Sequence, residues 1–97
     1  MAIPPGEKLH LKSDDVVWRE AGDELVVLEL STTTYLTLNG TAKQLWLGLA
    51  AGSTVEDLVG MLIETYGITS EQAMSDTESF VAELADRELI EEEHSAG

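Results

Sequence analysis

The sequence predicts a small α+β domain in which a three-stranded antiparallel sheet is followed by three helices. The chain has 97 residues, of which 43% are hydrophobic and 25% charged, which is the size and composition of one folded domain. Up to Leu38 the apolar residues follow the short, alternating pattern of strands, and beyond it they recur with the period of helices. Each amphipathic stripe must be covered by a facing sheet or helix, so the two halves are expected to pack together.

Three main strands are expected in the first half, at Val16–Glu20, Glu24–Leu30 and Thr33–Leu38, with a weaker strand at Glu7–Lys12. A three-stranded sheet has two edges, so the third strand offers unpaired backbone groups on which another chain could add. Polar turn signals separate the strands: Ser13-Asp14-Asp15, Ala21-Gly22-Asp23 and Ser31-Thr32-Thr33.

Two helices are expected directly after the strands. The first begins after Asn39, a good N-cap residue, and ends at Gly52. Ser53 and Glu56 form a capping box for the second, which runs to Gly67. Their apolar stripes comprise Ala42, Leu45, Trp46 and Leu49 in the first helix and Val55, Leu58, Val59, Leu62, Ile63 and Tyr66 in the second.

Thr69 with Gln72 repeats the capping signal and starts a third helix. Its apolar register continues close to Leu89 and Ile90. The chain therefore divides into an N-terminal arm at 1–15, a folded domain at 16–90 and an acidic, flexible tail at 91–97. One face of the third helix carries Ala73, Thr77, Phe80, Val81 and Leu84.

The charge of the chain excludes several classes of partner. Nineteen Asp and Glu residues against five Lys and Arg give a net charge of −14, which repels nucleic acids and anionic membranes and favours neutral, apolar or cationic partners. The longest apolar run, Leu45–Ala51, is interrupted by Gly48, so neither a signal peptide nor a transmembrane helix is expected. The chain has no cysteine, which suits the cytoplasmic location that we expect.

No group of residues has the pattern of a catalytic or metal site. Cysteine nucleophiles, thiolate metal sites and disulfides are excluded, and the two histidines, His10 and His94, are far apart in the sequence and are expected at the surface. Asp14-Asp15 is typical of a turn. The glycines lie singly, without a phosphate-binding spacing. We therefore expect no enzymatic activity, no metal and no cofactor.

The aromatic residues have two different expected roles. Trp46 and Phe80 lie within the apolar stripes of their helices, so both are expected to pack in the core. Tyr35 alternates with Leu36 and Leu38 in the third strand, so it points away from their face. There it either contacts a partner or packs across the strands.

The segment from Tyr35 to Ala42, which reads Tyr-Leu-Thr-Leu-Asn-Gly-Thr-Ala, leads directly into Leu45-Trp46. It is followed by Gly52, Thr54-Val55, Leu58-Val59, Leu62, Tyr66, Asp76, Phe80-Val81, Leu84 and Leu89-Ile90. With these residues, the stretch from Val16 to Glu92 resembles the PqqD-like family. These RiPP recognition elements bind the leader region of ribosomally made precursor peptides. One departure is Glu88, because the family often carries Gly just before the last Leu-Ile pair.

The resemblance implies a winged-helix-like fold in which the leader peptide adds beside the third strand and packs against the third helix. Within the helix stripe, Leu84 is expected in the core and Thr77 and Val81 in the groove. Asp76 and Glu83 are expected to attract a leader that bears Lys or Arg. The candidate peptide-binding residues are Thr33, Thr34, Tyr35, Leu36 and Thr37 on the strand and Asp76, Thr77, Phe80, Val81 and Leu84 on the helix.

The resemblance also implies a non-catalytic role: recognition of the precursor's leader and its delivery to a processing enzyme. The chain is similar to the stand-alone leader-binding proteins of split lasso-peptide systems, whose partner is a cysteine-type leader peptidase. A peptide chaperone of pyrroloquinoline quinone biosynthesis, from the same family, is the first alternative. The second is a winged-helix regulator. Because Arg87 is the only base between Thr69 and Arg87, such a regulator is expected to bind a protein rather than DNA.

Overall fold

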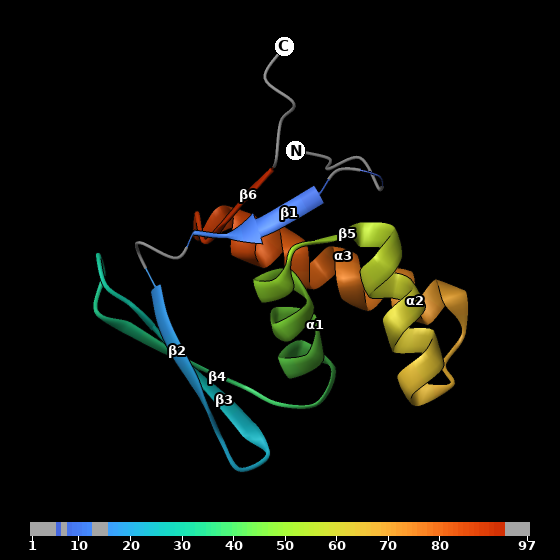
Figure 1. The fold of residues 1–97 in the computed structure, drawn as a ribbon, viewed down its shortest axis with the longest axis horizontal. Helices are drawn as coiled ribbons and strands as arrows, with labels where there is room; N and C mark the ends of the chain where they lie inside the picture. The colour runs from blue at the N-terminus through green and yellow to red at the C-terminus, as the bar shows by residue number, and fades with distance from the viewer. Residues whose placement is uncertain (1–5, 7, 13–15, 93–97) are drawn as a thin grey trace.

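The computed structural model describes residues 6, 8–12 and 16–92 (Figure 1). Both the predicted α+β class and the expected sheet followed by three helices are confirmed. Among the described residues, no helix is long and apolar enough to cross a bilayer. The elements are, in chain order, β1 (Lys8–Leu11), β2 (Val16–Ala21), β3 (Glu24–Glu29), β4 (Thr34–Leu38), α1 (Gly40–Ala51), β5 (Ser53–Thr54), α2 (Val55–Tyr66), α3 (Ser70–Asp86) and β6 (Ile90–Glu92).

In the described part of the chain, the strands form two separate antiparallel sheets of three strands each. The first has the order β2-β3-β4 and extends from the helices as a wing in Figure 1. The second has the order β5-β1-β6, and it was not expected from the sequence. The expected weak strand is present as β1, but it pairs with β5 and β6 rather than with the wing. β6 extends two residues into the predicted tail, and residues 93–97 lie outside the described part of the chain.

The wing begins with a tight hairpin. Ala21 pairs with Glu24 across a two-residue loop, and Gly22 has φ +64°, the conformation that a type II′ turn needs at its first central position. Two-residue hairpin loops of this kind fix the register of the flanking strands, because the closing pair exchanges both backbone hydrogen bonds. The pairing of the other residues of β2 with those of β3 follows from this turn.

The core lies between the two sheets and the helices. Trp46 of α1 is fully buried, as predicted, and its ring meets that of Trp18 of β2 edge-on, with centroids 6.3 Å apart. At Gly48 helices α1 and α2 approach closely, since a Cβ there would lie 2.6 Å from Leu58 Cδ2. Leu9 of β1 is fully buried as well, so the second sheet is part of the same core.

The helix starts follow the sequence signals with one correction. Thr69 Oγ1 accepts a hydrogen bond from Gln72 N at 3.1 Å, which confirms the predicted cap of α3. For α2 the capping residue is Thr54, which accepts from Asp57 N at 3.0 Å, rather than Ser53. The Ser53 hydroxyl instead donates to the carbonyl of Gly48 at 2.8 Å. Asn39 occupies the N-cap position of α1 without a side-chain hydrogen bond.

The end of α3 explains why the helical register was misleading. Leu89 N donates to Leu84 O at 2.9 Å and Glu88 N donates to Ala85 O at 3.0 Å, which together form a Schellman motif. The motif requires a left-handed residue, and Glu88 has φ +59°. This is the position at which the resembled family often has Gly. The turn redirects the chain, so Leu89 and Ile90 are buried beyond the helix end rather than along the helix.

Candidate functional site

Among the described residues, no strand pairs with the outer edge of β4, which is therefore a free edge. In an antiparallel sheet, the residues of a strand point their N–H and C=O groups alternately to one neighbour and to the other. The hairpin at Gly22 directs those of Glu24, Val26 and Leu28 toward β2, so the alternate residues of β3 bond to β4. By the same register, the backbone groups of Tyr35 and Thr37 point away from the sheet. Both residues were predicted from the sequence.

The side chains of β4 separate onto two faces. Leu36 and Leu38 are half-buried and pack against the core, whereas Tyr35 is 67% exposed on the opposite face, as predicted. On that outer face Tyr35 lies across from Leu28, which lies across from Val17. The inner face therefore leaves apolar surface only partly covered beside the free edge.

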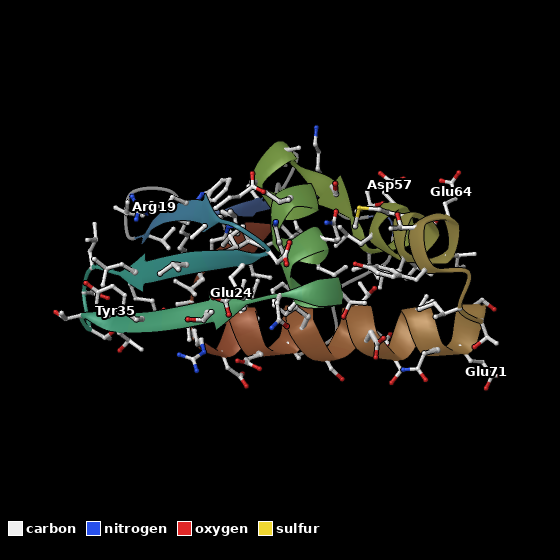
Figure 2. All side chains as sticks on the ribbon, turned by 90° about the horizontal axis from the view of Figure 1, so that it is seen from below. Arg19, Glu24, Tyr35, Asp57, Glu64 and Glu71 are labelled. Atoms are coloured by element: carbon white, nitrogen blue, oxygen red, sulfur yellow. The ribbon has the colours of Figure 1, made fainter. Side chains whose placement is uncertain are left out.

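Two contacts relate helix α3 to β4, through β3 at one end and through α1 at the other. At one end, Arg87 at the end of α3 bonds to Glu29 of β3, whose partner in the register is Thr34 of β4. At the other end, the middle of α3 shares a pocket with the first residues of α1, which directly follow β4. In Figure 2 the strands lie in the order β2, β3, β4 toward the level of α3. The open edge is thus on the side of the sheet nearest α3.

This pocket has a volume of about 240 Å³. Ala42, Leu45 and Phe80 supply its apolar lining, and Phe80 is only partly buried. Asp76 and Glu83 supply carboxylates. The complete lining is Thr41, Ala42, Leu45, Asp76, Ser79, Phe80 and Glu83. We call this pocket, together with the free edge of β4 that leads into α1, the groove.

Burial corrects the predicted position of two of the helix residues. Thr77 and Val81, expected in the groove, are 0% and 4% exposed and belong to the core. The reason is geometric: they share one helix face with Ala73 and Leu84, and that face packs inward. Leu84 was expected in the core, and its exposure of 1% agrees.

The face of α3 that borders the groove is instead the one with Asp76, Ser79, Phe80 and Glu83. Ser79 was missed because it is a small polar residue, although its spacing of three from Asp76 and four from Glu83 places it on the same face. Thr41 and Ala42 were missed because they lie at the start of a different helix. On the strand, Thr33 has φ +54° in the turn before β4, and Thr34 is half-buried.

The groove carries two carboxylates, each of which contacts one neighbouring side chain of α3 or its C-cap. Gln72 Nε2 donates to Asp76 Oδ1 at 2.8 Å, and Arg87 Nε lies 3.5 Å from Glu83 Oε2. Both contacts are exposed and leave carboxylate oxygens available to solvent or a ligand. Across the described residues, no three His, Asp or Glu side chains are grouped as a metal site would require.

Comparison with known proteins identifies the family. The family model of coenzyme PQQ synthesis protein D (PqqD) matches residues 24–90. The structure of TbiB1 in complex with the TbiA(beta) leader peptide is similar, with a TM-score of 0.78, 30% identity, and coverage of 84% of this chain and 94% of that one. Lasso peptide synthetase B1 complexed with its leader peptide shares the fold, with a TM-score of 0.75, 20% identity, and coverage of 86% and 96%. No curated protein matches the chain. Because the family model spans more than half of the sequence, the chain belongs to the PqqD family.

Proposed function

We propose that this protein binds the leader region of a ribosomally made precursor peptide as an added strand on β4. The observation that carries the proposal is the free β4 edge, which leads into a pocket between α1 and α3 that has both apolar and acidic lining residues. Strand addition takes its affinity from main-chain hydrogen bonds and its specificity from side-chain pockets, and the groove offers both. The relative TbiB1, with 30% identity over most of the chain, binds a leader peptide.

In this arrangement the backbone groups of Tyr35 and Thr37 pair with the peptide. Alternate peptide side chains then point inward, beside Leu36 and Phe80, and outward, beside Tyr35. The inward side chains that lie against Leu36 and Phe80 should be apolar, because both of these side chains are apolar and only partly buried. A Lys or Arg in the leader would lie close to Asp76 and Glu83.

The protein itself does not catalyse a reaction in this proposal. It holds the leader in the cytoplasm so that a separate processing enzyme can act on the precursor. We assign the precursor to a lasso-peptide system and the enzyme to a cysteine-type leader peptidase, following the sequence resemblance. The fold shared with lasso peptide synthetase B1 is compatible with this assignment.

Calorimetry with a synthetic leader peptide tests the proposal. The peptide is taken from the precursor gene that neighbours the gene of this protein, and the TbiA(beta) leader serves as a second probe. We expect a dissociation constant on the order of micromolar to tens of nanomolar, since the peptide loses conformational entropy as it orders. Absence of heat and of spectral change for both leaders at roughly 100 μM protein would contradict leader binding.

A second candidate within the same site is the precursor peptide of pyrroloquinoline quinone. The match to the family model of coenzyme PQQ synthesis protein D favours it. The same titration with that precursor peptide separates the two candidates, because the tighter ligand identifies the biosynthetic system.

A further inference from the structure

We propose that two ion pairs between the wing and the helices, Glu29–Arg87 and Glu20–Lys43, set the width of the groove and thereby position β4 for its peptide. The inference rests on the proposed function for its biological meaning, but the effect on the width of the groove can be measured without any ligand. Arg87 and Lys43 are positioning residues in this account.

The first pair joins the far end of the wing to the end of α3. Arg87 Nη1 lies 3.1 Å from Glu29 Oε2, and the Glu29 side chain is only 5% exposed. Arg87 Nε also reaches Glu83 Oε2 at 3.5 Å, so one guanidinium contacts a buried carboxylate on the wing and an exposed one on α3. Since Glu29 pairs with Thr34, this contact fixes the position of the first residue of β4.

The second pair joins the hairpin end of the wing to α1. Lys43 Nζ lies 3.2 Å from Glu20 Oε1 and 3.5 Å from the carbonyl oxygen of Gly22. The Lys43 side chain is 15% exposed, so its stem is packed against the protein. The two pairs therefore hold the wing at opposite ends of its strands, with the groove between them.

Cationic side chains are scarce in this protein. The chain has only five Lys and Arg residues against nineteen acids, yet two of the five bridge the wing to the helices. The apolar contact of β4 with the helices is incomplete, because Leu36 and Leu38 are half-buried while Leu25 and Val27 of β3 are fully buried. β4 is thus held mainly through β3, and the ion pairs at the ends of the wing determine how far its edge lies from α3.

Spin labels measure this distance directly. The protein contains no cysteine, so Val17→Cys and Glu78→Cys give two exposed labelling sites, one on the wing near Glu29 and one on α3, both outside the groove. In the parent protein, pulsed electron paramagnetic resonance should give a narrow distance distribution. Arg87→Met should broaden it, and leader affinity should fall about tenfold.

Matched variants distinguish a change in the position of β4 from the effects of a lost charge or of unfolding. Arg19→Met removes the same charge from an exposed site on the wing and should leave both the distribution and the affinity unchanged. Arg87→Lys should restore most of the narrow distance distribution and most of the leader affinity, because the ammonium can still pair with Glu29. If Arg87→Met leaves Glu29 unpaired and the protein unfolds, the double variant Glu29→Gln with Arg87→Met removes the unpaired buried charge and gives the same readout in a folded protein.

The two hypotheses fail in different ways. A parent protein that binds no leader overturns the proposed function, while the distance measurement still tests the ion pairs. An unchanged distance distribution and an unchanged leader affinity in folded Arg87→Met and Lys43→Met variants would overturn the positioning role.

Discussion

The two sheets described in this protein have the same number of strands, but their edge strands differ in length and in whether they can accept a further strand. The wing is built from consecutive segments, and its edge strand β4 is five residues long and open. The second sheet joins three distant segments, and its edge strands β5 and β6 are two and three residues long. Short edges cannot accept another strand, whereas a long open edge can. The difference indicates that the second sheet closes the fold and that the wing is available for binding.

The largest expected effect is a loss of stability from a substitution in the second sheet, β5-β1-β6, which we call the closing sheet. Leu9→Ala removes a fully buried side chain from β1 and should lower the free energy of unfolding by roughly 2–5 kcal/mol, measured by denaturant titration. Leader affinity at low temperature, where the variant remains folded, should match that of the parent. If Leu9→Ala kept its stability but lost leader affinity, the assignment of separate roles to the two sheets would be wrong, because the closing sheet would then belong to the binding site.

The next effect concerns the open edge. Thr37→Pro removes a backbone N–H that points away from the sheet, so leader affinity should fall by about 1–3 kcal/mol in calorimetry. Thr37→Ala is the matched control, since it keeps the N–H, and it should bind almost normally.

Leu36→Pro provides the complementary test for the same strand. Its N–H points toward β3, so the substitution should destabilise the wing itself, which circular dichroism detects. Equal binding by the parent and a folded Thr37→Pro variant would show that the peptide does not pair along β4.

A smaller effect of opposite sign is expected where α3 leads into β6. Glu88 adopts a left-handed conformation that favours glycine, so Glu88→Gly should raise the stability by about 1 kcal/mol in thermal unfolding. Leader affinity should not change, because the residue serves the closing sheet. Lower stability in this variant would mean that the Glu88 side chain makes a contribution larger than its backbone strain.

The smallest effect concerns charge in the groove. Asp76→Asn should reduce the association rate of a Lys- or Arg-bearing leader and weaken its dependence on salt, with only a few tenths of a kcal/mol lost in affinity at physiological ionic strength. Stopped-flow measurements at two salt concentrations provide the test. Glu71→Gln, on the exposed first turn of the same helix, is the control and should have the parent's rate.

The sequence was sufficient for the wing, because each of its signals is local. Alternation in β3 and the turn at Gly22 each depend on neighbouring residues, and outside the wing the same is true of the helix cap at Thr69. The second sheet could not be predicted in the same way, since nothing in Lys8–Leu11 alone specifies that it pairs with Ile90–Glu92. Leu89 and Ile90 continued the spacing of the helix, and only the left-handed turn at Glu88 separates them from it.

The strand residues of the candidate site could be predicted from local alternation, but the helix residues could not. Period-two alternation assigned Tyr35 and Leu36 to opposite faces, and burial agrees. On α3 a single stripe of apolar residues had to be divided between core and groove, and periodicity does not say where the division falls. It falls beside Phe80: Thr77 and Val81 are inside, while Asp76 and Ser79 border the pocket.

The pairing of β1 with β6 has a consequence for protein engineering and for fusion proteins. Because the strands are antiparallel and Leu9 lies opposite Glu92, the start of one and the end of the other lie at the same corner of the molecule (Figure 1). A domain tethered at either end would leave the fold from this corner, on the far side of α1 from the tip of the wing hairpin.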